Sequence, residues 1–246
     1  MVLQEKPYRA DTRIAMREWI GKKNADPAYR PFAVIMKSAD VCNYACSYCY
    51  VEHRSAVPIM SDATVRLAIS KILEYVPADR KINFIYHGGE PLTPGLDFFK
   101  RIADFCETFE GRIIENCIQT NGSLLDEEFL EFCSQRAFSV SLSIDGPREM
   151  HDINRKDRNG RGTFDRTMAG IEMVKSMGLA PGCVCVLHRR NIAHIDEIYS
   201  FFRENGIHFR INPVVRAGRA KTVYNSLSIF AGSLRRGDVQ IVRPVV

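Results

Sequence analysis

Short apolar runs alternate with amphipathic segments along most of this chain. The runs are about six to eight residues long and rich in β-branched side chains, which is typical of buried strands. They lie at residues 32–37, 82–87, 113–120, 138–144, 182–187 and 209–215. We therefore predict six strands.

Between the strands, apolar residues recur at intervals of three and four, which is the period of a helix with one buried face. The clearest case runs from Val65 to Val76 behind Ser61, a candidate N-cap. Two other helices are predicted to end before Gly178 and Gly206, since glycine commonly follows a helix C-terminus. The four helices predicted after the first cover residues 96–109, 124–133, 163–177 and 195–205, and the last two of these are the ones that end before Gly178 and Gly206.

A strand followed by a helix thus recurs about six times, which indicates an α/β fold. Nearly continuous apolar strands separated by helices are typical of a parallel sheet covered by helices. Right-handed crossovers between such units give either an open barrel or a doubly wound sheet. The pattern alone does not choose between these two.

Composition narrows the class of protein. With 246 residues, 46% hydrophobic and 26% charged, the chain fits one large soluble domain. No apolar run approaches the roughly 18 residues that would span a membrane, and the first residues lack the apolar segment of a secretion signal. We therefore expect a cytoplasmic protein whose eight cysteines are reduced. The net charge of +5 is spread along the chain, so no nucleic-acid partner is expected.

The short motifs of unusual composition follow predicted strands. They read VCNYACSYCY from residue 41, HGGEP from residue 87, QTNG from residue 119 and SIDGP from residue 143. The carboxyl ends of parallel strands meet at one edge of a sheet or barrel, where active sites form. We therefore expect these four loops to build one site.

Cys42, Cys46 and Cys49 stand within eight residues, at spacing C-x3-C-x2-C. Disulfides use cysteines in pairs, and structural zinc takes four ligands. A [4Fe–4S] cluster held by three thiolates keeps one iron open for a ligand. The alternative is a zinc module in which His53 supplies the fourth ligand, but it leaves HGGEP and the six β-α units unexplained.

The order CNYACSYC after a first strand and GGEP after a second resembles the radical S-adenosylmethionine (SAM) superfamily. The resemblance implies a partial (β/α)6 radical SAM barrel with a [4Fe–4S] cluster on Cys42, Cys46 and Cys49. It also implies that SAM chelates the open iron and is cleaved reductively to a 5′-deoxyadenosyl radical.

The resemblance further implies which residues bind SAM. Tyr48 matches the aromatic position beside the adenine, and an aromatic ring with a polar tip suits a purine. Gly88, Gly89 and Glu90 match the segment that receives the SAM ammonium group, where glycines permit close backbone approach and a carboxylate can accept hydrogen bonds.

Ser143 and Arg155 resemble a pair that binds the SAM ribose and carboxylate. A guanidinium is suited to forked recognition of a carboxylate. The surrounding residues 141–178 resemble the anaerobic sulfatase-maturating enzymes and related SPASM-type maturases. This implies an oxidoreductase that modifies a side chain of a protein or peptide, such as a sulfatase Cys or Ser oxidised to formylglycine. A flavodoxin or ferredoxin would supply the electron.

The resemblance also divides the chain into an N-terminal extension (residues 1–30), a radical SAM core (31–220) and an atypical tail (221–246). We expect the cysteine-rich SPASM domain, with its auxiliary clusters and general base, to be absent, so no catalytic acid or base is assigned. An alternative is therefore a truncated domain that binds SAM and the cluster without turnover. The remaining cysteines are expected to be core residues: Cys106, Cys117, Cys133, Cys183 and Cys185.

Overall fold

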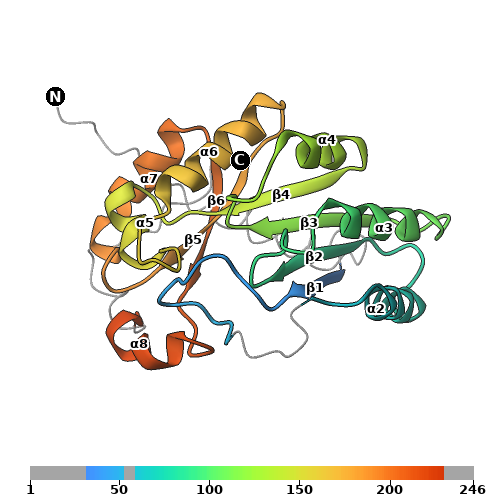
Figure 1. Ribbon diagram of the computed structural model, residues 1–246, viewed down its shortest axis with the longest axis horizontal. Coiled ribbons are helices and arrows are strands. Elements are labelled where there is room, and N and C mark those ends of the chain that lie inside the picture. Colours follow the sequence, from blue (N-terminus) through green and yellow to red (C-terminus); the bar gives the residue numbers. More distant parts are fainter. Residues whose placement is uncertain (1–31, 53–58, 230–246) are drawn as a thin grey trace, which may run out of the picture.

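Six parallel strands follow one another in a single sheet in a computed structural model of the chain, which describes residues 32–52 and 59–229 (Figure 1). Each of the six strands predicted from the sequence is confirmed, with ends that shift by no more than about two residues. They are β1 (Phe32–Ala39), β2 (Ile82–Gly88), β3 (Ile114–Thr120), β4 (Phe138–Ser143), β5 (Gly182–Leu187) and β6 (His208–Pro213).

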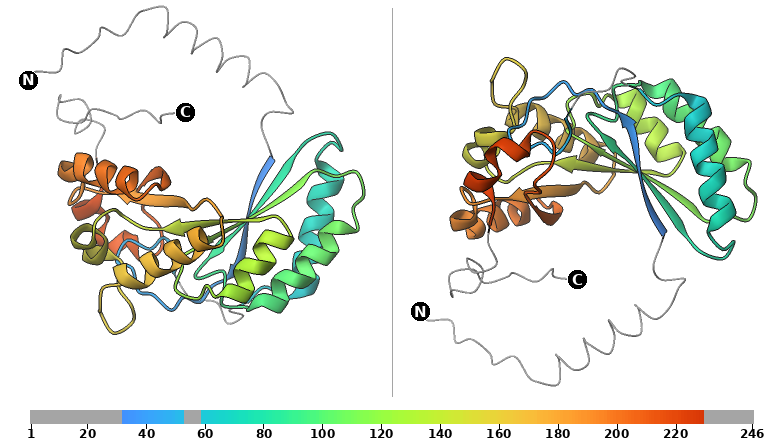
Figure 2. Two further views of the ribbon diagram at one scale, coloured as in Figure 1. Left: turned by 90° about the horizontal axis from the view of Figure 1, so that it is seen from above. Right: turned by 90° about the horizontal axis from the view of Figure 1, so that it is seen from below.

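The strand order settles the choice that the sequence pattern left open. The sheet runs β1-β2-β3-β4-β5-β6 without reversal, whereas a doubly wound sheet reverses its order at a switch point. Figures 1 and 2 show the helices arranged around the twisted strands, with α2, α3, α4, α6 and α7 following one another in an arc in Figure 1. The partial (β/α)6 barrel implied by the resemblance is confirmed.

All five predicted helices form. Ser61 caps the first of them by accepting a hydrogen bond from the Thr64 amide at 3.2 Å. Gly178 and Gly206 stand beyond two helix ends with φ of +71° and +60°, the left-handed conformation that ends helices at glycine. The helices are α2 (Asp62–Tyr75), α3 (Leu96–Glu107), α4 (Glu127–Gln135), α6 (Phe164–Ser176) and α7 (Ile195–Glu204).

Two short helices were not predicted: α5 (Arg148–Asn154) and α8 (Ala220–Leu227). Seven or eight residues are too few for a helical period to stand out in the sequence. The predicted boundary between core and tail falls one residue inside α8, whose Ala220 and Leu227 pack in a small apolar cluster with Tyr48. Residues 1–30, His53 and residues 230–246 lie outside the described residues.

The main core lies between the sheet and the arc of helices. At its centre Phe99 of α3 is fully buried and meets Tyr86 and Phe129 edge to face. Four of the cysteines expected in the core are buried and Cys117 is half-buried, and none of them forms a disulfide. Among the described helices, none has the length and apolarity to span a bilayer.

Replacing Phe99 by alanine should lower the free energy of unfolding by about 3–5 kcal/mol, because it removes a buried ring and leaves a cavity. Denaturant unfolding followed by circular dichroism measures this change. Leu67→Ala is the control, because Leu67 lies on α2 with 61% of its surface exposed and should change stability by less than about 0.5 kcal/mol. Equal effects of the two substitutions would contradict this account of the core.

Candidate active site

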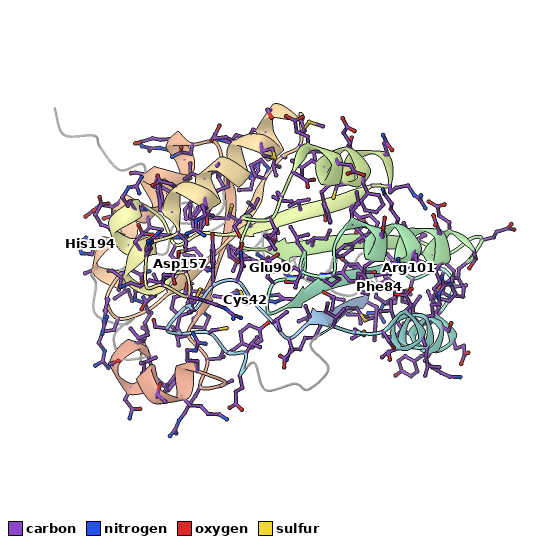
Figure 3. The ribbon with its side chains drawn as sticks, viewed as in Figure 1. Cys42, Phe84, Glu90, Arg101, Asp157 and His194 are labelled. Atoms are coloured by element: carbon purple, nitrogen blue, oxygen red, sulfur yellow. The ribbon has the colours of Figure 1, made fainter. Side chains whose placement is uncertain are left out.

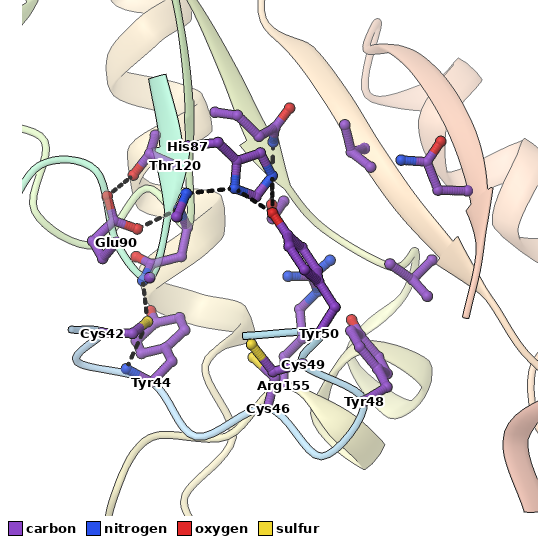
Figure 4. A pocket seen from close by; sticks show the side chains of 18 of the residues that line it. Cys42, Tyr44, Cys46, Tyr48, Cys49, Tyr50, His87, Glu90, Thr120 and Arg155 are labelled. Atoms are coloured by element: carbon purple, nitrogen blue, oxygen red, sulfur yellow. Dashed lines mark hydrogen bonds between the residues drawn. The ribbon is translucent and has the colours of Figure 1, made fainter. Parts of the chain in front are cut away.

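One cavity opens at the carboxyl ends of the strands, and it gathers every site residue predicted from the sequence (Figure 4). Figure 3 places Cys42 and Glu90 near the centre of the molecule, away from the core residue Phe84. The predicted residues that line the cavity are Cys42, Cys46, Tyr48, Cys49, Gly88, Gly89, Glu90, Ser143 and Arg155. Residues up to 113 positions apart thus meet at the expected edge of the sheet.

The three cysteines lie on the loop that follows β1. Cys42 Sγ accepts a hydrogen bond from the Tyr44 amide at 3.3 Å. The Cys49 amide donates a hydrogen bond of 3.3 Å to the Cys46 carbonyl, which closes a turn. Burial raises the pKa of Cys42 to about 11 and that of Cys46 to about 12. These thiols therefore keep their protons at neutral pH unless a metal replaces them.

The arrangement of the thiols bears on the zinc alternative. In the described part of the chain, no three side chains of His, Cys, Asp or Glu converge closely enough to enclose one metal ion. A zinc ion with Zn–S bonds of about 2.3 Å requires such convergence. A cubane instead takes each thiolate on a different iron, so it does not require the three sulfur atoms to surround a single ion. His53, the fourth ligand of the zinc alternative, lies outside the described residues.

Gly88 and Gly89 allow the loop after β2 to touch the start of the cysteine loop. Gly88 has φ of +136°, and a Cβ there would lie 2.2 Å from the Ala39 carbonyl oxygen. A Cβ on Gly89 would lie 2.0 Å from the Val41 carbonyl oxygen. The amides of Gly89 and Glu90 donate to these same two carbonyls at 2.7 Å. The glycines were expected to let the backbone approach a ligand closely. In the structure, they let it approach the carbonyl groups of Ala39 and Val41.

Glu90 is buried beneath the cavity and ties the loop after β2 to the loop after β3. Its carboxylate accepts hydrogen bonds from Thr120 Oγ1 at 2.5 Å, from the Asn121 amide at 2.8 Å and from the Leu92 amide at 3.1 Å. Burial raises the pKa of Glu90 to about 7, although these bonds oppose the rise. A carboxylate can accept about four hydrogen bonds, so Glu90 uses most of its lone pairs within the protein and has few left for a ligand.

Asp145, which sequence reasoning did not single out within SIDGP, lies behind the cavity wall and joins three residues that line it. Its fully buried carboxylate accepts hydrogen bonds from Tyr48 Oη, from Arg155 Nη2 at 3.0 Å and from the Val186 amide at 2.9 Å. Burial alone would raise the pKa of Asp145, but the Arg155 guanidinium holds it below the ordinary value. The guanidinium carbon of Arg155 also lies 5.4 Å from the centre of the Tyr48 ring.

Three buried polar atoms on residues of the cavity wall have no hydrogen-bond partner among the described residues: Arg155 Nε, Gln119 Oε1 and Tyr44 Oη. Gln119 Nε2 donates to Ser143 Oγ at 3.1 Å, so Gln119 and Ser143 stand together. Leaving such a donor and acceptor unsatisfied costs about 1–3 kcal/mol each, and a polar ligand would offset this cost. Three thiols, an aromatic ring and an unsatisfied guanidinium donor fit a cluster together with an amino-acid-like ligand.

Further residues of the cavity wall were missed by sequence reasoning. Tyr50 Oη lies 3.0 Å from His87 Nδ1, and Arg210 and Asn212 enter from β6. Each stands in or next to a segment at the carboxyl end of a strand. Their closeness to a strand end was the sequence feature that could have identified these residues. It does not show which side chains near a strand end face the cavity.

Comparisons of the sequence and of the structure with known proteins both find similar proteins. Residues 36–202, from within β1 to within α7, match the model of the radical SAM superfamily. A Cysteine-type anaerobic sulfatase-maturating enzyme of Clostridium perfringens (strain 13 / Type A) is 33% identical over 188 residues, covering 73% of this chain and 50% of the relative. A Serine-type enzyme of Bacteroides thetaiotaomicron is 34% identical over 200 residues, covering 77% and 48%.

A solved structure described as native anSMEcpe with bound AdoMet and Cp18Cys peptide superposes with a TM-score of 0.69 at 30% identity, covering 76% of this chain and 52% of that one. The chain thus spans about half the length of the relatives it matches. The matched family model covers most of the chain, including the loops that carry the cysteines, the two glycines, Ser143 and Arg155. On this match, which confirms the resemblance seen in the motifs, the chain belongs to the radical SAM superfamily.

Proposed function

We propose that this chain is an oxidoreductase that binds a [4Fe–4S] cluster and SAM in the cavity described above and oxidises a side chain of a protein or peptide. The observation that carries the proposal is the gathering of three cysteines and six expected SAM-binding residues around one cavity. When bound, the cluster and SAM supply the electron and the 5′-deoxyadenosyl radical.

Different residues of the chain would bind the cluster and SAM. Cys42, Cys46 and Cys49 would hold three irons, leaving the fourth for SAM. Arg155 Nε is the buried donor available to the SAM carboxylate, while Nη2 of the same guanidinium holds Asp145. Tyr48 is fixed by its hydrogen bond to Asp145, and this fixed ring would lie beside the adenine.

For the substrate, we propose a sulfatase-type Cys or Ser that is converted to formylglycine. The support is the identity of about one third to curated sulfatase-maturating enzymes and the peptide bound in the similar solved structure. A cytoplasmic setting with a flavodoxin or ferredoxin as electron donor belongs to the same proposal. The division of the chain at residue 220 also stays a prediction.

A second candidate is a domain that binds the cluster and SAM without substrate turnover. The observation that favours it is the state of Glu90, the carboxylate among the described residues of the cavity wall, which already accepts three hydrogen bonds. Oxidation of a side chain also requires loss of a proton, and these hydrogen bonds occupy most of the lone pairs with which Glu90 would accept one.

Anaerobic reconstitution should load about four irons on each chain, as one cubane requires. Cys46→Ala should abolish this loading, because three thiolates are needed to leave a single iron open. Cys133→Ala should load iron like the parent, because Cys133 is buried in α4 outside the cavity. Iron and sulfide analysis measures both. A Cys46→Ala protein that retains four irons would refute the assignment of the cluster site.

SAM binding should depend on the Arg155 guanidinium. Alanine at this position would leave Asp145 buried without its cation, at a cost of about 3–5 kcal/mol, so lysine is the better test. Arg155→Lys keeps the charge but loses the Nε donor, and we expect SAM binding about tenfold weaker by equilibrium dialysis. Arg148→Lys is the control, because Arg148 pairs with Asp165 on the surface. Parental affinity in Arg155→Lys would show that Arg155 does not hold SAM.

Sulfatase-derived peptides containing Cys or Ser should be oxidised when incubated with reduced chain and SAM. We expect 5′-deoxyadenosine to exceed formylglycine, because Glu90 is already engaged and the proton of the substrate leaves slowly. Mass spectrometry counts both products. SAM cleavage with no formylglycine on any peptide would favour the second candidate over side-chain oxidation.

A further inference from the structure

The segment of residues 154–158, here called the brace, runs antiparallel beside the cysteine loop. Main-chain contacts join the two over their whole common length. They pair Ser47 N with Asn154 O at 3.0 Å, Ala45 N with Lys156 O at 2.7 Å, and Tyr44 with Asp157 in an isolated antiparallel bridge. Ser47 Oγ adds a hydrogen bond to Asn154 Oδ1 at 2.6 Å. The brace therefore supports the cysteine loop along the side away from β2.

Arg158 extends this support to Cys42. Its Nε and Nη2 both donate to the Cys42 carbonyl oxygen, at 3.1 Å and 2.7 Å, across 116 positions of sequence. Two donors of one rigid guanidinium on one carbonyl fix the direction of that carbonyl. The main chain that carries Cys42 is thus held from outside the cysteine loop, whereas its thiol lines the cavity.

The brace is itself fixed by Asp157. Oδ1 of Asp157 accepts hydrogen bonds from the amides of Asn159 and Arg161 at 2.9 Å each, which closes the turn after Arg158. Oδ2 accepts from Arg166 Nη2 at 2.7 Å, which anchors the turn to α6. Figure 3 shows Cys42 and Asp157 on neighbouring segments of the same part of the molecule. Arg158 is therefore presented to Cys42 from a turn with a defined conformation.

We propose that Arg158 is a positioning residue that holds Cys42 for cluster binding through the Cys42 carbonyl. This inference rests on the proposed function, because it requires a cluster on Cys42, Cys46 and Cys49. A cluster bound by thiolates is anionic, so the fixed guanidinium also favours its further reduction by placing a positive charge beside the first ligand.

The same turn supplies a matched control. Arg161 has the same charge and lies three residues further along, and its side chain makes no hydrogen bond or ion pair with the described residues. The contrast between Arg158 and Arg161 separates the contact with Cys42 from a general effect of positive charge near the site.

The full chain would be reconstituted anaerobically as parent, Arg158→Gln, Arg158→Lys and Arg161→Gln. Two quantities would be measured: the rate of iron loss to excess EDTA, and the midpoint potential of the cluster by titration followed with electron paramagnetic resonance. Circular dichroism before iron loading would show that each variant is folded.

We expect Arg158→Gln to lose iron about threefold to tenfold faster than the parent, because it loses an exposed, charge-assisted contact that both Nε and Nη2 make with one carbonyl. Its midpoint potential should be more negative. Arg158→Lys should restore the potential and part of the iron retention, and Arg161→Gln should match the parent in both. Parental behaviour of Arg158→Gln, or equal changes in Arg161→Gln, would overturn the proposal. A parent chain that binds no iron would instead refute the proposed function.

Discussion

The carboxylate of Asp145 is the constraint around which the cavity is assembled. It lies fully buried just beyond β4 and binds three other segments: the cysteine loop through Tyr48, β5 through the Val186 amide, and the end of α5 through Arg155. A buried carboxylate is costly unless it is paired and its lone pairs are used. The hydrogen bonds that satisfy the Asp145 carboxylate come from Tyr48 and Arg155, so they place an aromatic ring and a guanidinium on the same wall of the cavity.

Glu90 plays a corresponding part at the other side of the cavity, with a different electrostatic result. It joins the loops after β2 and β3 through a hydroxyl and main-chain amides, and no cation is among its hydrogen-bond partners in the part of the chain that the structure describes. Burial therefore raises the pKa of Glu90 to about 7, whereas Arg155 keeps the pKa of Asp145 low. Two buried carboxyl groups thus connect adjacent strand ends, and of these two only Asp145 has a permanent countercharge among the described residues.

These connections explain how a loop of three cysteines can lie over the strand ends in a defined position. On one side, Gly88 and Gly89 let the chain approach the start of the loop more closely than any side chain would allow. On the other side, the brace of residues 154–158 pairs with the loop, and Arg158 binds the Cys42 carbonyl. The loop is thereby held by main-chain contacts, and its thiols are free to face the cavity.

The sequence by itself determined the six strands, the five longer helices and the edge of the sheet where the site lies. Apolar periodicity, N-caps such as Ser61 and stop signals such as Gly178 act over a few residues, so they can be read locally. The nine site residues were predicted from the resemblance of their motifs to a known family; eight of them lie at or after the ends of strands, whereas Arg155 lies at the end of α5.

Tertiary structure alone decided the helices α5 and α8 and the partners of the buried charges, and it settled the strand order that the apolar pattern left open. Tyr48 and Asp145 are 97 positions apart, and Arg158 is 116 positions from Cys42, so no local pattern relates them. Whether Asp145 is buried with several hydrogen-bond partners or exposed at the surface depends on which segments cover it. That depends on the path of the whole chain, because burial and pairing arise only where distant segments pack together.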